Sequence, residues 1–361
     1  MLITFGRLSH PFRFLLLLLT LFITSCQQKP TEVKVIQNLV YGNYNFQDRE
    51  KPLLLDLYLP EKKTDKPLPL LIYIHGGGWL QGTKEYCPGK IVAQRNYIMA
   101  CISYRFSNEA LFPAQIQDVK KAVRWLRKNA DKYDIDPNNF GAWGPSAGGH
   151  LSALLGTSAG AKELEGTNNP EISSAVQAVC SWYPLTDFTK VSPAFDELIT
   201  PAVEEKYQDK EWYGYTLVTN KLLGGPVSQK LELAALANPI NYIDAQDPPF
   251  LIMHGEKDNV VPMSQSVLLA DALSEKGVEV QLEKKPDWGH YHGRGEPFDP
   301  GLIDMAMNFF DKHLGVGKLG YDINLNYLGV NPPLTPPRRG SQSSGVNPPL
   351  TPPRRGRKKK K

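Results

Sequence analysis

One serine in the sequence has the surroundings of a nucleophile. Residues 144–148 read GPSAG, which is the spacing G-x-S-x-G, and they follow an apolar, strand-like segment at 140–143 and lead into a helix-like stretch. A sharp strand-to-helix turn requires small residues two positions from the serine, and Gly144 and Gly148 meet that requirement. Such a turn lifts the hydroxyl clear of the sheet at the N-terminus of a helix. We therefore predict that Ser146 is a nucleophile; a glycine-rich turn with an incidental serine is the alternative.

A run of glycines could stabilise negative charge next to that serine. HGGGW at 75–79 directly follows the apolar segment 68–74, and glycine lets the backbone approach a substrate with its N–H groups unobstructed. Each donor to the oxygen of an attacked carbonyl typically lowers the barrier by about 2.7–4 kcal/mol. His75 is expected to orient the loop and Trp79 to pack beneath it. The expected donors are the N–H groups of Gly76, Gly77 and Ala147. A phosphate-binding loop is excluded, because no G-x-x-x-x-G-K-[ST] is present.

A neutral serine needs a base, and the base needs a carboxylate to orient it. The strand-like segment 250–253 is followed by HGEKD at 254–258. A carboxylate in the loop after a parallel strand lies at the same edge of the sheet as Ser146. We predict that Asp258 is the acid, and Glu256 is the alternative by position.

Three of the seven histidines follow the predicted acid. His290 is the predicted general base, because it follows a glycine in a loop after the strand-like segment 278–284. His292 is the alternative, and His313 is expected to be exposed on a closing helix at 302–314. An H-x-H pair can also bind a metal ion, but no matching cluster of Cys, Asp or Glu accompanies it. We therefore expect neither a metal ion nor an organic cofactor.

The elements that must position these residues alternate between strand and helix. The predicted strands lie at 53–59, 68–74, 98–104, 140–143, 176–182 and 250–253. The segments 68–74 and 250–253 are continuously apolar, which is typical of strands covered on both faces, whereas 53–59 alternates. Two segments have helical spacing, 116–128 with Val119, Ala122, Val123 and Leu126 on one face, and 264–276 with Val267, Leu268, Ala270 and Leu273 on one face. His150 is expected to be packed in the helix after Ser146. This order predicts an α/β fold, a mainly parallel sheet covered by helices on both faces.

Composition limits the remaining possibilities. The chain has 361 residues, 22% charged and 10% aromatic, which excludes a wholly disordered chain. Four cysteines cannot make a disulfide scaffold at this length. The net charge of +4 comes from the two ends, because residues 27–314 hold 29 basic and 36 acidic residues. A net charge of −7 for that region gives no reason to expect nucleic-acid binding.

The two ends differ from the region between them. Residues 1–25 are predicted to be a lipoprotein signal peptide, because a basic start and a short apolar run lead to ITSC, which resembles the bacterial lipoprotein box. Lipid attachment to Cys26, followed by a tether at 26–32, would make the protein exported and anchored to a bacterial membrane. An ordinary signal peptide is the alternative. Residues 315–361 contain GVNPPLTPPRRG twice and a polybasic end, and are predicted to be disordered. A translated repeat without function is favoured there over a basic arm.

Residues 50–314 resemble the α/β-hydrolase superfamily, and in particular the bacterial esterases that include bifunctional feruloyl and acetyl-xylan esterases, near the hormone-sensitive-lipase-like carboxylesterases. The segments that carry the resemblance are DLYLP (56–60), HGGGW (75–79), SYR (103–105), FPAQIQDVKKAVRWLRKNA (112–130), IDPNNFGAWGPSAGGHLSALLG (135–156), WYPLTDF (182–188), PPFLIMHGEKDNVVP (248–262) and GH (289–290). The resemblance implies the α/β-hydrolase fold over 33–314, a Ser146–Asp258–His290 triad and cleavage of a small ester. Pro145, Trp288 and Tyr291 depart from the usual pattern and leave the substrate open.

The resemblance also implies an insertion at about 187–238 that roofs the pocket. Its aromatic residues could stack on a sugar or an aromatic acyl group, or could pack the roof itself. Short-chain acyl esters, including esters of carbohydrates, are the expected substrates. An amide or peptide hydrolase on the same triad and a catalytically silent binding module are the alternatives. Of the remaining cysteines, Cys101 and Cys180 are expected to be buried, and a disulfide between Cys87 and one of them is left open.

Overall fold

The computed structural model describes residues 32–190, 213–290 and 298–315. All of them belong to the first of two units into which the chain divides, Met1–Leu319 and Gly320–Lys361. The predicted signal peptide with Cys26, the repeat-containing tail, part of the insertion and His292 lie outside the described residues. No helix within the described ranges is both long and apolar enough to cross a membrane.

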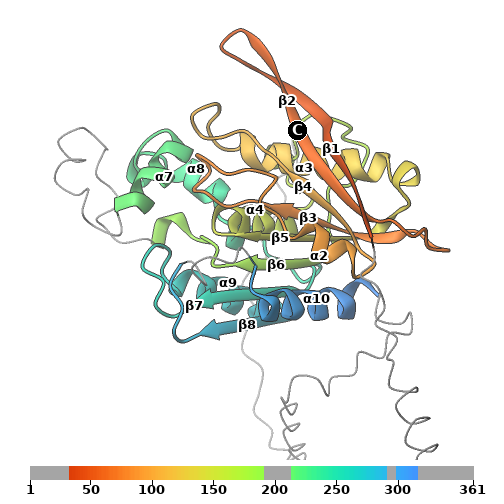
Figure 1. The fold of residues 1–361 in the computed structure, drawn as a ribbon. Coiled ribbons are helices and arrows are strands. Elements are labelled where there is room, and N and C mark those ends of the chain that lie inside the picture. The colour runs from red at the N-terminus through yellow and green to blue at the C-terminus, as the bar shows by residue number, and fades with distance from the viewer. Residues whose placement is uncertain (1–31, 191–212, 291–297, 316–361) are drawn as a thin grey trace, which may run out of the picture. The chain divides into compact units, whose positions relative to one another are not determined.

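The described strands form one eight-stranded sheet in the order β1-β2-β4-β3-β5-β6-β7-β8 (Figure 1). Strands β1 and β2 are antiparallel, β2 is antiparallel to β4, and all later pairs are parallel. The strands are β1 (Val33–Phe46), β2 (Arg49–Pro60), β3 (Leu68–Ile74), β4 (Ile98–Ile102), β5 (Ile135–Pro145), β6 (Ala178–Trp182), β7 (Phe250–Gly255) and β8 (Val280–Lys285). The predicted mainly parallel sheet is confirmed, with an antiparallel hairpin added at one edge.

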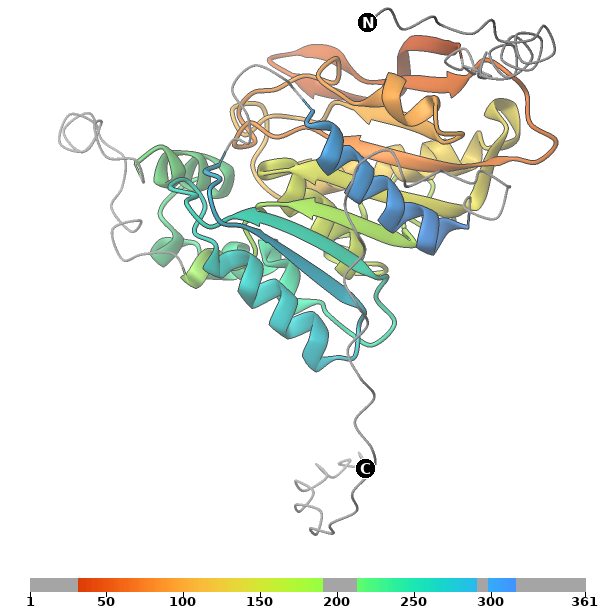
Figure 2. The ribbon, with the colours of Figure 1, turned by 60° about the horizontal axis from the view of Figure 1, so that its bottom comes forward.

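Helices cover both faces of this sheet. They are α2 (Gly89–Ala93), α3 (Ala114–Lys128), α4 (Ala147–Thr157), α5 (Lys162–Glu165), α7 (Tyr213–Leu223), α8 (Leu231–Ala237), α9 (Ser264–Glu275) and α10 (Pro300–Leu314). Helices α3, α4, α8 and α9 contribute to one hydrophobic core, and α2 and α10 contribute to the other. Figure 2 shows α10, in blue, running across one face of the sheet. In β3, Leu70 and Ile72 face the first core while Leu71 and Tyr73 face the second, which explains why an unbroken apolar run is buried throughout.

Strand β2 differs from its prediction. The segment 53–59 was expected to alternate between buried and exposed positions, but Leu55 through Tyr58 are all buried. Leu55 and Leu57 pack into the first core and Tyr58 into the second. Asp56, on the same face as Tyr58, is buried because the ammonium of Lys84 lies 2.9 Å from its carboxylate. The strand is therefore covered on both faces. The charged residue at position 56 gave its sequence the alternation of a strand with one exposed face.

Two helices lie at their predicted positions, but the predicted buried face of one of them was only half right. Val119, Ala122, Val123 and Leu126 of α3 are all fully buried, as predicted. In α9, Ala270 and Leu273 are buried as predicted, but Val267 and Leu268 are only half-buried. Gln265 and Ser266 are completely buried instead. The reason is that these two polar side chains hydrogen-bond inward, Gln265 to residues 186 and 187 and Ser266 to His254.

His313 also differs from its prediction. It was expected to be exposed on the closing helix, but its side chain is 12% exposed. Its ring lies 4.8 Å from that of Phe309, and its Nε2 is 3.6 Å from a carboxylate oxygen of Glu279. Contacts with the preceding turn and with the segment before β8 therefore cover it.

Candidate active site

Ser146 stands at the sharp turn between β5 and α4. Its backbone has φ 53° and ψ −120°, a conformation that a residue with a side chain rarely adopts. Its N–H donates to the Trp182 carbonyl at 2.8 Å, which ties the turn to the end of β6. A Cβ on Gly144 would lie 2.5 Å from the Ile74 carbonyl oxygen, and one on Gly148 would overlap the same oxygen. The two glycines are therefore required for the close approach of β3 to this turn.

The structure brings Ser146, His290 and Asp258 into one hydrogen-bonded series. The Nε2 of His290 is 3.0 Å from the Ser146 Oγ, and its Nδ1 is 2.8 Å from the Asp258 Oδ2. The three residues follow β5, β8 and β7 respectively, at the carboxyl ends of parallel strands. Glu256, the alternative acid, is exposed, and its N–H donates to the Lys285 carbonyl. His292, the alternative base, lies outside the described residues.

The Asp258 carboxylate is completely buried and accepts hydrogen bonds at both oxygens. Its Oδ1 accepts from the N–H groups of Val260 and Val261, both at 2.8 Å. Its Oδ2 lies 2.8 Å from His290 and 3.2 Å from the Nε2 of His254. Burial raises the pKa of Asp258, but the hydrogen bonds from His254, His290 and Val261 outweigh it and hold the pKa well below its ordinary value. The Asp258 carboxylate therefore stays ionised at neutral pH.

His290 is held on a second side by an aromatic ring. The ring of Tyr183 meets that of His290 edge-on, with 4.7 Å between the centroids. Tyr183 directly follows β6 with φ 38°, and its N–H donates to the Met253 carbonyl at 2.7 Å. His290 itself is 4% exposed. The imidazole is thus fixed between the acid and the tyrosine before any substrate enters.

The glycine loop lies against the nucleophile turn. A Cβ on Gly76 would lie 2.9 Å from the Pro145 carbonyl oxygen and 3.5 Å from the Cβ of Ser146. Gly77 has φ +105°, and its carbonyl accepts from the next turn of the loop. Among the residues that the structure describes, no acceptor pairs with the N–H of Gly76, Gly77 or Ala147. The three predicted donors are therefore not committed to other acceptors in this part of the chain.

Buried rings pack against the glycine loop. His75 is 4% exposed, its Nδ1 lies 2.8 Å from the Gly76 carbonyl oxygen, and its ring stacks on Tyr104 at 4.4 Å. Burial lowers the pKa of His75, which favours the neutral ring. Trp79 is buried as predicted, with its ring 5.2 Å from that of His150. His150 is packed as predicted, and burial lowers its pKa to about 4.

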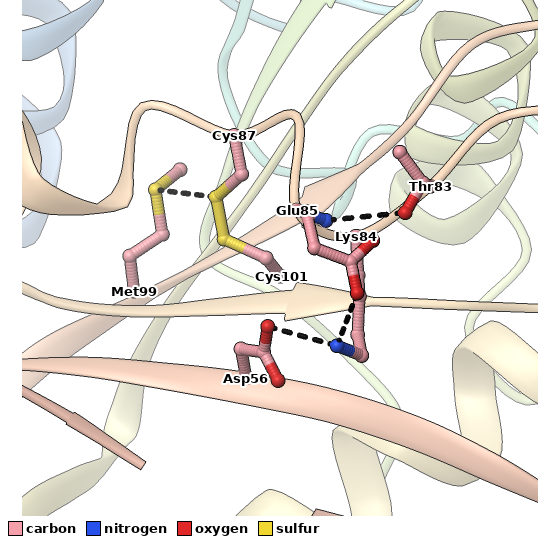
Figure 3. Close-up of a disulfide and its surroundings, with 7 residues drawn as sticks. All are labelled: Asp56, Thr83, Lys84, Glu85, Cys87, Met99 and Cys101. Atoms are coloured by element: carbon pink, nitrogen blue, oxygen red, sulfur yellow. Dashed lines mark hydrogen bonds and ion pairs between the residues drawn. A yellow bond between two sulfur atoms is a disulfide. The ribbon is translucent and has the colours of Figure 1, made fainter. Parts of the chain in front are cut away.

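The chain after the glycine loop is anchored to the sheet twice (Figure 3). The Nζ of Lys84 lies 2.9 Å from the Asp56 Oδ2 in β2, and the Lys84 side chain is only 6% exposed. Three residues later, Cys87 forms a disulfide with Cys101 in β4. The disulfide that the sequence left open is therefore present, while Cys180 is buried with a free thiol.

The predicted insertion begins and ends at one buried polar network. The side-chain NH₂ of Asn238 donates to the Asp187 Oδ1 at 2.9 Å, and the side-chain Oδ1 of Asn238 accepts from the N–H of Phe188 at 2.8 Å. Between these ends, α7 reaches the glycine loop, since a Cβ on Gly78 would lie 2.7 Å from a methyl group of Val218. The aromatic residues expected in the roof before position 213 lie outside the described residues. The described part of the predicted insertion therefore contacts the glycine loop.

Sequence reasoning missed the residues behind the acid. His254 was visible four positions before Asp258, but it ends an apolar strand and has the surroundings of a core residue. No sequence motif marks Tyr183 as a site residue. Its contact with His290 arises only because the strands that precede the two residues lie near each other in the folded sheet. Across the three described stretches, no group of three or more His, Cys, Asp or Glu is arranged to hold a metal ion.

The sequence is similar to known esterases. A family model described as BD-FAE matches residues 55–273, a range that includes Ser146 and Asp258 and ends before His290. The esterase LipQ of Mycobacterium tuberculosis is 31% identical over 262 residues, which cover 71% of this chain and 58% of LipQ. The chain therefore spans little more than half the length of this curated relative, and 52% of the esterase LipC from the same organism.

Solved structures with a similar fold include a protein named as a carbohydrate esterase. A truncated carbohydrate esterase from gut microbiota is 29% identical with a TM-score of 0.62, and the match covers 79% of this chain and 97% of that one. A bifunctional GH43-CE protein of Bacteroides eggerthii is 30% identical with a TM-score of 0.63, over 77% of this chain and 38% of that one.

Proposed function

Because the chain belongs to the BD-FAE family and has the α/β-hydrolase fold, we propose that it is a serine hydrolase that cleaves carboxylic esters. The observation that carries the proposal is the hydrogen-bonded series from the Ser146 Oγ through His290 to Asp258. In it Ser146 is the nucleophile, His290 the general base and Asp258 the acid that orients the imidazole.

The proposed reaction has two halves. The Ser146 Oγ attacks the ester carbonyl while the Nε2 of His290 takes its proton, and the N–H groups of Gly76, Gly77 and Ala147 stabilise the oxyanion. The tetrahedral intermediate collapses, the alcohol leaves with the proton from His290, and an acyl-enzyme remains. Water then attacks the acyl-enzyme with His290 as the base, and the acid is released with Ser146 restored.

We propose short acyl esters of carbohydrates as the substrates. The two solved relatives at 29–30% identity are named a carbohydrate esterase and a bifunctional GH43-CE protein, which supports a carbohydrate on the alcohol side. The contact of Val218 with Gly78 supports a short acyl group, because α7 occupies space next to the glycine loop.

Hydrolysis of p-nitrophenyl acetate, butyrate and octanoate by the full chain tests this proposal. We expect turnover that favours the short esters and falls by a factor on the order of 10⁴ to 10⁶ in Ser146→Ala. Ser152→Ala is the matched control, since it removes a buried hydroxyl from the same helix outside the proposed triad. Equal rates for wild type and Ser146→Ala would refute the proposal. Faster cleavage of the octanoate ester than of the acetate ester would refute the short acyl group. Faster turnover of p-nitroacetanilide than of p-nitrophenyl acetate would indicate an amidase.

We also propose that the protein is exported and lipid-anchored through Cys26. The Cys87–Cys101 disulfide supports an oxidising compartment, because such bonds are rare in the cytosol. Fractionation of a bacterial host is expected to find the wild-type chain in the membrane fraction and Cys26→Ser outside it. Equal membrane association of the two would refute the lipid anchor.

A further inference from the structure

We infer that His254 is a positioning residue that holds the Asp258 carboxylate in place for His290. The inference deepens the proposed function and rests on it. His254 lies at the end of β7, four residues before Asp258, and its side chain is completely buried. Its Nε2 lies 2.9 Å from the Val261 carbonyl oxygen and 3.2 Å from the Asp258 Oδ2. Its Nδ1 lies 2.6 Å from the Ser266 Oγ in α9.

The neighbours of the His254 ring determine which nitrogen carries the proton. Both groups next to Nε2 are acceptors, a carbonyl oxygen and a carboxylate oxygen, so Nε2 must carry a proton and donate. In the neutral ring Nδ1 is then an acceptor, and the Ser266 hydroxyl donates to it. The carbonyl and carboxylate oxygens of the loop after β7 therefore require the tautomer that donates toward Asp258, and the hydroxyl on α9 is compatible with it.

This donor completes the set of hydrogen bonds that fixes the acid. Val260 and Val261 hold Oδ1 from the backbone, while His290 and His254 share Oδ2. Without His254, Oδ2 would keep His290 as its donor, and the carboxylate plane could turn about the fixed Oδ1. Such a turn would move the imidazole relative to the Ser146 Oγ, which lies at the far end of the same series.

His254 cannot itself be the base. It is 1% exposed, and its two nitrogens are taken by the contacts to Val261, Asp258 and Ser266. The ring of Tyr183 lies beside both imidazoles, with centroids 4.7 Å from His290 and 6.3 Å from His254. His254 therefore acts on the reaction through the position of Asp258.

Two amide substitutions separate positioning from packing. In His254→Gln the side-chain nitrogen can reach the place of Nε2 and donate to Asp258, whereas in His254→Asn it reaches only the place of Nδ1. With p-nitrophenyl acetate, we expect His254→Asn to lower kcat roughly 10–100-fold with KM unchanged, as for a small misplacement of a catalytic group. We expect His254→Gln to recover most of that loss. Leu273→Ala, which removes a buried leucine from α9, is the control for lost stability and should lower the unfolding midpoint without this kcat pattern.

A measurement on the wild-type protein covers the case in which a variant does not fold. In ¹⁵N-histidine NMR spectra we expect His254 to carry its proton on Nε2, and a ring protonated only on Nδ1 would overturn the inference. Wild-type kcat in His254→Asn, or equal losses in the Gln and Asn variants, would also overturn it. Ser146→Ala is measured in parallel. If esterase activity does not depend on Ser146, the proposed function fails; if it does and His254→Asn is fully active, only the present inference fails.

Discussion

Replacing Asp258 by Asn reverses the direction of one hydrogen bond in the proposed triad. The N–H groups of Val260 and Val261 both need an acceptor at the position of Oδ1, so the amide oxygen must stay there. The NH₂ group then takes the place of Oδ2 and faces His290 and His254. His290 avoids a contact between two donors by moving its proton from Nδ1 to Nε2.

The size of the effect follows from that change of tautomer. With a proton on Nε2, His290 donates to the Ser146 Oγ at 3.0 Å and cannot accept the serine proton. A base held in the wrong tautomer lowers kcat by about 10⁴ in a triad of this kind. At 1.36 kcal/mol for each tenfold change, the barrier rises by about 5.4 kcal/mol. The KM should stay close to that of the wild type, because no group that contacts the substrate changes.

Steady-state hydrolysis of p-nitrophenyl acetate measures this loss. Glu256→Gln is the matched control, since it removes the exposed carboxylate two residues earlier in the same loop. A surface substitution is expected to change kcat no more than about twofold. A kcat for Asp258→Asn within tenfold of the wild type would refute the tautomer argument. A comparable loss in Glu256→Gln would refute the assignment of Asp258 as the acid.

Two further predictions concern the segment after the glycine loop. Lys84→Met should lower the free energy of unfolding by about 3–5 kcal/mol in urea denaturation, because it leaves the buried Asp56 carboxylate without its cation. Adding Asp56→Asn should restore most of the loss. Additive losses in the double variant would contradict the ion-pair explanation. The Cys87–Cys101 disulfide joins residues 14 positions apart, and its reduction should lower the free energy of unfolding by roughly 3 kcal/mol. Identical denaturation curves with and without reductant would contradict a stabilising disulfide.

The sheet was predictable wherever burial depends on hydrophobicity alone. Strand β3 matches its predicted range, because seven consecutive residues pack against helices on both faces. Strand β1 was not predicted. Its pairing with β2 shifts register between residues 36 and 39 and again between 40 and 42, so its apolar residues do not keep a period of two. It also lies at the edge of the sheet, where most of its side chains are half-buried or exposed.

The parts of the site differ in how far the sequence could predict them. Ser146 and its flanking glycines form a local motif, because the turn itself requires small residues. Gln265 and Ser266 have no such signal, since polar residues in a helix are usually exposed. Their partners are distant, with Gln265 bonded to residue 186 and Ser266 to His254. The burial of these two polar side chains therefore follows from contacts that exist only in the folded protein.

The distribution of hydrogen bonds in the site has a consequence for catalysis. The Asp258 carboxylate is surrounded by four N–H groups, two from the backbone and two from imidazoles. The N–H groups of Gly76, Gly77 and Ala147 have no acceptor among the described residues. One side of the site is therefore fully satisfied before substrate binds, and in the proposed mechanism it would not need to reorganise when charge develops on His290. In the proposed mechanism, the other side meets an acceptor when the substrate binds, and its hydrogen bonds strengthen as the oxyanion forms, so that they stabilise the transition state more than the bound ester. Substitutions around Asp258 should accordingly lower kcat through the position of the base, whereas substitutions in the glycine loop should lower it through the charge on the substrate.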